Sequence, residues 1–245
     1  SIALACKLYG IQPCIVVVPE GNNPEKNNAM RAHGATLVEH GKDYDQARAL
    51  VETMCRRQED NLTYVHSGNE PHLIHGVGTY SLEIVRDQWP NDVDTIIVPV
   101  GGGSGICGAI TVVRALKPSV RIVGVQAANA SSVYQSWKKG GVATTTETAH
   151  TVADGLATRC PFALPLSIMA HKDAGVDEFV LVTEDEIKEA VRVTWETTHN
   201  VAEGAAAAAM AATIKLAPQL RDSKVVTVLS GSNMDAPTLQ HMLQS

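Results

Sequence analysis

Four glycines and one serine fill the five positions Gly101–Gly105, and no other stretch of the chain suggests chemistry as strongly. Because glycine has no Cβ, the backbone N–H groups of such a loop can approach an anion closely. An apolar, β-branched run at 96–98 precedes the loop, and a helical pattern at 106–116 follows it. The start of a helix adds unpaired N–H donors and a partial positive charge. This order predicts a phosphate site, with a tight turn that binds nothing as the alternative.

Two familiar phosphate loops can be compared with this one. Gly103–Gly108 has the spacing of a dinucleotide-binding loop, which expects an acidic residue near the end of the next strand to bind a ribose hydroxyl. Here that strand ends at Gln126, and an amide does not replace the carboxylate. NAD binding is therefore the less favoured alternative. No Lys-Ser/Thr pair follows the glycines, which excludes a Walker A loop.

Short apolar runs alternate with helical patterns and supply the framework for the loop. Such alternation predicts an α/β fold with parallel strands and helices on both faces of the sheet. A Thr-x-x-Glu capping box at Thr183 and Glu186 marks the start of one helix. The least periodic part, 126–165, is expected to help form a site. Strands are predicted at 15–18, 36–38, 62–65, 96–98, 121–125, 179–182 and 224–229, and helices at 2–9, 25–32, 44–58, 73–84, 106–116, 184–195 and 203–216.

Composition narrows the class of protein. The 245 residues are 44% hydrophobic, enough for a large core, and the net charge of −6 includes no basic block that suggests nucleic acid. The longest apolar run, 205–212, is too short to cross a membrane, and the start lacks the basic region of a secretory signal. Five cysteines without a CxxC pair favour a reducing compartment, so the cytoplasm is expected. His72 and His75 share a helix face, but no third metal ligand is near them in sequence.

Five segments of the chain carry a family pattern: Ser-Ile-Ala-Leu-Ala at 1–5, Glu-Pro to Gly-Val-Gly-Thr at 70–79, Val-Pro-Val-Gly-Gly-Gly-Ser-Gly at 98–105, Val-Ala-Asp-Gly-Leu-Ala at 152–157 and Ser-Gly-Ser-Asn at 230–233. In this order they resemble pyridoxal-phosphate enzymes of the tryptophan-synthase-β type, especially threonine and serine dehydratases. The resemblance implies a fold-type II architecture: two open, twisted, mostly parallel sheets flanked by helices, with the N-terminal part missing. It implies that 1–70 are the remainder of a smaller α/β domain and 71–245 a larger cofactor-binding domain.

The resemblance also implies roles for individual residues. It assigns the phosphate of pyridoxal 5′-phosphate to the backbone of Gly101, Gly102, Gly103, Ser104 and Gly105. Gly155 is then expected beside the cofactor ring, and the Ser230 hydroxyl at the pyridine nitrogen. A hydroxyl does not hold that nitrogen protonated as a carboxylate would, which limits electron withdrawal and favours β-elimination. Glu203 matches an acidic position at the start of a Gly/Ala-rich helix, where it serves either the pocket or the helix dipole.

The chain departs from this family in three places. The family's Ser-Phe-Lys segment, whose lysine forms the Schiff base, and its Asn-His loop are expected before Ser1, so this chain alone is expected to be inactive. Gln126, Ala130 and Ser132 stand where some relatives bind a divalent cation, and we expect no strong Mg²⁺ site there. His66–Pro71 differs from the usual His-Pro-Phe-Asp-Asp-Pro and is closer to dehydratase-like proteins linked to ectoine breakdown. This difference in the segment leaves the identity of the substrate open.

The implied function is β-elimination from a small β-hydroxy amino acid, such as threonine or serine, to a 2-oxo acid and ammonia. The amino-acid substrate and a second copy of the chain, in a homodimer, are the expected partners, with no nucleic acid or membrane. A non-catalytic paralogue that binds pyridoxal phosphate or another phosphate ligand is the main alternative, and an NAD-dependent dehydrogenase is the second.

Overall fold

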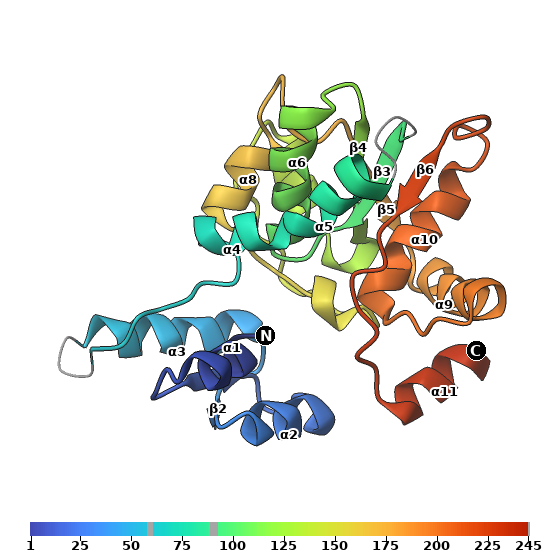
Figure 1. The fold of residues 1–245 in the computed structure, drawn as a ribbon. Coiled ribbons are helices and arrows are strands. Elements are labelled where there is room, and N and C mark those ends of the chain that lie inside the picture. The colour runs from blue at the N-terminus through green and yellow to red at the C-terminus, as the bar shows by residue number, and fades with distance from the viewer. Residues whose placement is uncertain (58–60, 89–92, 245) are drawn as a thin grey trace. The chain divides into compact units, whose positions relative to one another are not determined.

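The computed structural model describes residues 1–57, 61–88 and 93–244. The chain forms two compact units, Ser1–Val65 and His66–Ser245 (Figure 1). In the smaller unit, strands β1 (Ile15–Val18) and β2 (Thr36–Glu39) pair in parallel. The helices of this unit are α1 (Ile2–Tyr9), α2 (Pro24–Ala32) and α3 (Tyr44–Arg56).

The larger unit contains a four-stranded parallel sheet in the order β5-β4-β3-β6. Its strands are β3 (Thr95–Pro99), β4 (Arg121–Ala127), β5 (Glu178–Val182) and β6 (Val225–Thr227). Its helices and helical turns are α4 (Pro71–Val77), α5 (Thr79–Leu82), η2 (Glu83–Gln88), α6 (Ser104–Leu116), η3 (Ala128–Ala130), α7 (Ser132–Lys138), η4 (Asp154–Leu156), α8 (Ala163–Met169), α9 (Glu184–Thr198), α10 (Gly204–Leu216) and α11 (Ala236–Gln244).

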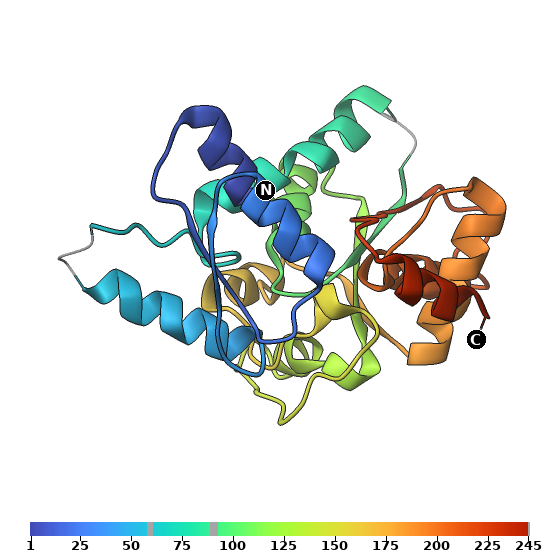
Figure 2. The ribbon, with the colours of Figure 1, turned by 90° about the horizontal axis from the view of Figure 1, so that it is seen from below.

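Helices cover both faces of this sheet because alternate strand residues point to opposite sides. On β3, Ile96 and Val98 face a core shared with α6, whereas Ile97 faces a core shared with α9 and α10. Figure 1 shows α4, α5, α6 and α8 on one side of the sheet and α9 and α10 on the other, and Figure 2 shows the same unit from below. The expected α/β class, with parallel sheets flanked by helices, is confirmed.

Helix starts follow the local sequence. The Thr183 hydroxyl accepts the Glu186 N–H at 3.2 Å, while the Glu186 carboxylate accepts the Thr183 N–H at 2.7 Å, so the predicted capping box of α9 is confirmed. In the smaller unit, Asn23 caps α2 and Asp43 caps α3 with side-chain oxygens. These groups satisfy N–H donors that the first turn of a helix leaves unpaired.

Two predicted elements are wrong. No strand forms at 62–65: Leu62 and Tyr64 are half-buried and alternate with exposed neighbours, but this segment pairs with no strand of the described residues. The single helix predicted at 73–84 is divided at Gly78 into α4 and α5. A Cβ at Gly78 would lie 3.1 Å from the Gly108 carbonyl oxygen, so the division occurs where the chain crosses α6 closely.

Other boundaries differ by less. Strand β4 runs two residues beyond the predicted 121–125, and β6 covers only part of 224–229. Helix α11 was not predicted, because a single partly apolar segment beyond Ser230–Asn233 carried no clear period. The predicted end of the third helix at Gln58 lies outside the described residues.

Candidate functional site

The glycine loop joins the end of β3 to α6 in the larger unit. Gly103 is the N-cap of α6 and has φ of 96°, a left-handed conformation that glycine adopts without strain. The first hydrogen bond of the helix runs from the Cys107 N–H to the Gly103 carbonyl at 3.0 Å. Within the described residues, the backbone N–H groups of Gly102–Gly105 donate to no hydrogen-bond acceptor. The loop therefore presents a row of unpaired donors at a helix start, which suits an anion.

Close packing behind the loop requires its glycines. A Cβ at Gly101 would come within 3.0 Å of the Gly155 carbonyl oxygen, and one at Gly102 within 3.0 Å of the Phe162 ring. A Cβ at Gly103 would lie 2.9 Å from Pro165 Cβ. These distances are shorter than folded proteins tolerate, so the glycines allow the backbone to lie directly on its supports.

Gly155, which the family resemblance assigns to the side of the cofactor ring, lies against Gly101 of the loop. It belongs to η4, and a Cβ there would come within 2.9 Å of Ala205 Cβ on α10. Gly155 is thus held between the loop on one side and α10 on the other. The alanines Ala205–Ala209 are all buried, so close packing against η4 and the sheet accounts for the small residues of that helix.

Ser230 and Glu203 lie at the same edge of the sheet. Strand β6 pairs with β3, with Thr227 opposite Ile97, and Ser230 is exposed shortly after β6 ends. Glu203 is the N-cap of α10, and its N–H donates to the Gly231 carbonyl at 3.1 Å. Its carboxylate rests on Gly231, where a Cβ would lie 2.5 Å from Oε1. The loop, Ser230 and Glu203 therefore meet at the carboxyl ends of β3 and β6, where open α/β sheets bind ligands.

Half-buried Tyr80 and buried Cys107 lie next to the loop and were not singled out from the sequence. The Tyr80 hydroxyl donates to the Gly105 carbonyl at 3.1 Å. Burial raises the pKa of Tyr80 to about 12, so the hydroxyl keeps its proton and remains a donor. Burial likewise raises the pKa of the Cys107 thiol, in the first turn of α6, to about 12. Tyr80 was visible only as one residue of an apolar helical stripe, which carries no signal of its partner.

The positions compared with a cation site serve the packing of the larger unit. Gln126 is fully buried, and its Oε1 accepts the Tyr134 N–H at 2.8 Å. The Ser132 hydroxyl donates to the Thr158 carbonyl at 2.9 Å, and Ala130 is buried. In the three described ranges, no group of three or more His, Cys, Asp or Glu side chains is placed to hold a metal ion. Because it bonds to Tyr134, the Gln126 side chain faces α7.

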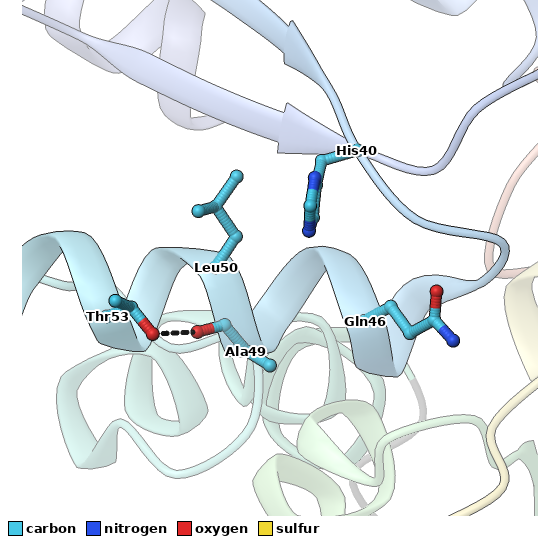
Figure 3. Close-up of a pocket in the computed structure, with 5 residues that line it drawn as sticks. All are labelled: His40, Gln46, Ala49, Leu50 and Thr53. Atoms are coloured by element: carbon cyan, nitrogen blue, oxygen red, sulfur yellow. Dashed lines mark hydrogen bonds between the residues drawn. The ribbon is translucent and has the colours of Figure 1, made fainter.

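A separate hollow lies on α3 in the smaller unit. Figure 3 shows its lining residues, with the Thr53 hydroxyl bonded to the Ala49 carbonyl at 2.9 Å. The Gln46 side-chain oxygen is also engaged, since it accepts the Lys42 N–H at 2.9 Å. Its polar groups are largely occupied, and none of the residues predicted to bind a cofactor lines it. The lining residues are His40, Gln46, Ala49, Leu50 and Thr53.

Comparisons with known proteins agree on one family. The profile described as "Pyridoxal-phosphate dependent enzyme" matches residues 1–231. The catabolic L-threonine dehydratase TdcB of Staphylococcus aureus is 34% identical over 247 aligned residues, which span all of this chain and 69% of the dehydratase. The processed form of threonine deaminase isoform 2 from Solanum lycopersicum superposes with a TM-score of 0.85 at 28% identity, over 99% of this chain and 70% of that one. Maize serine racemase gives the same score and identity, over 99% and 72%.

Among the described helices, none combines the length and the apolar character that a membrane crossing would need.

Proposed function

This chain belongs to the family of pyridoxal-phosphate-dependent enzymes, and we propose that it binds the cofactor phosphate on Gly101–Gly105 and serves the β-elimination of threonine or serine. The products are a 2-oxo acid and ammonia. Its cofactor is pyridoxal 5′-phosphate. The larger unit is then the cofactor-binding domain, and the smaller unit belongs to the second domain.

One observation carries this proposal. The N–H groups of Gly102–Gly105 have no acceptor in the described part of the chain, and the neighbouring backbone of Gly101 and Gly102 lies directly on Gly155 and Phe162. Such a cradle fits a phosphate, because N–H donors and the positive end of α6 converge there. The Ser104 hydroxyl, at the first position of α6, is a further donor for the same group.

The cofactor, when bound, provides an electron sink for the bond broken at the substrate Cα. We propose that the Ser230 hydroxyl donates a hydrogen bond to the pyridine nitrogen. We also propose that Gly155, which has no side chain, leaves room beside the cofactor ring. Glu203 holds its carboxylate against Gly231, the residue after Ser230, so its proposed role is to position Ser230 rather than to transfer a proton. A neutral hydroxyl at the nitrogen limits electron withdrawal and favours loss of a β-hydroxyl.

The substrate class rests on the relatives. The similar proteins are described as a threonine dehydratase and a threonine deaminase, and both names point to a small β-hydroxy amino acid. Threonine would give 2-oxobutanoate and ammonia, and serine would give pyruvate and ammonia. The His66–Pro71 segment, which differs from the usual family spelling, leaves the preference between them open.

The test is a product assay on the complete open reading frame that contains Ser1–Ser245. We expect 2-oxo acid and ammonia in equal amounts from L-threonine or L-serine, only when pyridoxal 5′-phosphate is present. Pyridoxal without phosphate should support less than about a hundredth of that rate, since a charge-assisted phosphate contact is worth several kcal/mol. Tight cofactor binding with no 2-oxo acid from either substrate would favour the non-catalytic paralogue instead.

The dehydrogenase alternative has no support from the site. The Gln126 amide is buried and bonded to the Tyr134 backbone. Titration of NADH with the protein should leave the nucleotide fluorescence unchanged.

Location and assembly extend the same proposal. The five cysteines are free, which suits a reducing compartment such as the cytoplasm. A homodimer is expected from the family resemblance, and sedimentation velocity would show it as a species of about twice 26.1 kDa.

A further inference from the structure

The larger unit begins with a tight turn, His66–Asn69, that the proposed function does not use. His66 is buried, and its Nδ1 accepts the N–H groups of Gly68 and Asn69, both at 3.0 Å. A ring nitrogen that accepts two N–H donors carries no proton. The turn is therefore held from inside by its own histidine.

The Phe162 ring contacts both this turn and the glycine loop. A Cβ at Gly68 and a Cβ at Gly102 would each come within 3.0 Å of the ring, and both would meet its Cδ2 and Cε2 atoms. The His66 ring meets Phe162 edge to face, with centroids 4.7 Å apart and planes at 87°. Phe162 is buried, with 4% of its surface exposed. One buried ring therefore touches a glycine of the turn and a glycine of the loop.

Helix α8, which starts next to Phe162, fixes both neighbours of the ring. The Asn69 side-chain oxygen accepts the Leu164 N–H at 3.1 Å, which ties the turn to the first turn of α8. Gly103 packs against the same helix α8, because a Cβ at this position would be 2.9 Å from Pro165 Cβ and 3.0 Å from Met169 Cε. The turn, the ring and the loop are thus packed on one support.

We propose that Phe162 is a positioning residue for the cofactor phosphate, and that the size of residue 68 sets where its ring lies. This inference rests on the proposed function, because it concerns the phosphate held by Gly101–Gly105. In a close-packed interior, a methyl group added at Gly68 displaces the ring on which Gly102 rests. The N–H donors then lose their common direction, and hydrogen bonds weaken steeply with angle.

The test measures binding of pyridoxine 5′-phosphate by isothermal titration calorimetry on the full chain. This ligand keeps the phosphate but has no aldehyde to react with exposed lysines. The proteins are wild type, Gly68→Ala, Phe162→Leu and the double variant, with Gly76→Ala as the matched control. Gly76 lies on α4, where a Cβ meets no atom within 4 Å.

We expect Gly68→Ala to weaken the affinity about tenfold and Phe162→Leu about threefold. In the Phe162→Leu background, Gly68→Ala should cost less than about twofold, because the smaller side chain leaves room for the methyl group. Gly76→Ala should leave the affinity unchanged. Pyridoxine without phosphate should bind all five proteins equally weakly. The melting temperature of each variant is measured in parallel, since a purely structural role lowers it without coupling the two affinities.

Several results would overturn the inference. The two substitutions could add fully in the double variant, or either single variant could bind with wild-type affinity. Phe162→Leu keeps an apolar side chain, so it provides a result even if Gly68→Ala does not fold. A wild-type protein that binds no pyridoxine 5′-phosphate would overturn the proposed function together with the inference. A wild-type protein that binds it, with additive variants, would overturn the inference alone.

Discussion

The absent Cβ of Gly101 is the smallest feature on which the candidate site depends. Gly101→Ala would push a methyl group into the Gly155 carbonyl. The nearest atoms all belong to the backbone of Gly155 and Leu156, which cannot move aside as a flexible side chain could. We expect a loss of about 1–3 kcal/mol in the free energy of unfolding, measured by urea denaturation. Gly76→Ala is the control, because open space surrounds that position and alanine favours a helix by about 0.5–1 kcal/mol. Equal stabilities for the two variants would contradict the packing described for the loop.

The Tyr80 hydroxyl is a second test at this scale. Tyr80→Phe leaves the Gly105 carbonyl without its donor, and we expect a loss of about 1 kcal/mol in the free energy of unfolding. Tyr134→Phe is the control, since its hydroxyl has no recorded hydrogen bond within the described residues. Burial raises the pKa of Tyr80 to about 12, above the unfolded value near 10.

The contribution of Tyr80 should therefore be complete below about pH 10 and should fall as the pH rises toward about 12. Unfolding measured at pH 7 and at pH 9 should give the same difference between wild type and Tyr80→Phe. A difference that already disappears between these two pH values would contradict the assignment.

Ser230 decides how strongly the cofactor ring withdraws electrons, if the proposed function holds. Ser230→Asp should raise the pKa of the ring nitrogen by at least one unit, and we expect the share of turnovers that end in Cα reprotonation to rise about tenfold. The measurement is deuterium uptake at the substrate Cα against 2-oxo acid formed, in D₂O. Ser230→Ala, which is also uncharged, should leave this ratio close to wild type. An unchanged ratio in Ser230→Asp would contradict the proposed hydrogen bond between Ser230 and the ring nitrogen.

At the scale of elements, the start of α9 shows how a local motif and a distant charge combine. Glu186 accepts the Thr183 N–H, and the Lys215 ammonium on α10 lies 3.0 Å from its carboxylate. Partial burial works against the charge, but these partners prevail and lower the pKa of Glu186. Because the folded value lies below the unfolded one, the carboxylate stabilises the fold above the unfolded pKa, and this contribution is lost as the pH falls through the folded pKa.

Glu186→Gln keeps an acceptor for the capping box and removes the charge. We expect a loss of about 0.5 kcal/mol at pH 7, since the pair is partly exposed and screened by solvent. The loss should shrink below about pH 4.3. Chemical denaturation at pH 7 and at pH 3.5 measures both values, with Asp185→Asn as the control for charge in the same helical turn. A loss that is equal at both pH values would contradict the role of the ionised carboxylate.

Elements were predictable where the signal is local. The capping box of α9, the buried run of β3 and the helix predicted at 2–9 each depend on a few neighbouring residues, and each prediction is confirmed. The strand predicted at 62–65 failed because a strand needs a partner, which its own alternation does not supply. The prediction of one helix at 73–84 missed the division between α4 and α5 for a related reason. It depends on the close approach of Gly78 to Gly108, and that contact lies 30 residues away in sequence.

At the scale of the whole molecule, the order of strands and helices was enough to predict an α/β fold with parallel sheets. The candidate site was only partly predictable. The glycine loop was predictable from its composition, whereas site roles for Gly155, Glu203 and Ser230 were predicted only from the family resemblance. Phe162 was missed, because its role comes from two glycines that meet its ring only in the folded chain.

The central claim is that the loop before α6 holds the cofactor phosphate, and a ¹⁵N–¹H NMR titration with pyridoxine 5′-phosphate tests it most directly. The account predicts that the largest saturable shifts belong to the amides of Gly102, Gly103, Ser104 and Gly105, and that pyridoxine without phosphate does not produce them. Largest shifts at the α3 hollow of His40–Thr53, or equal shifts with both ligands, would contradict it.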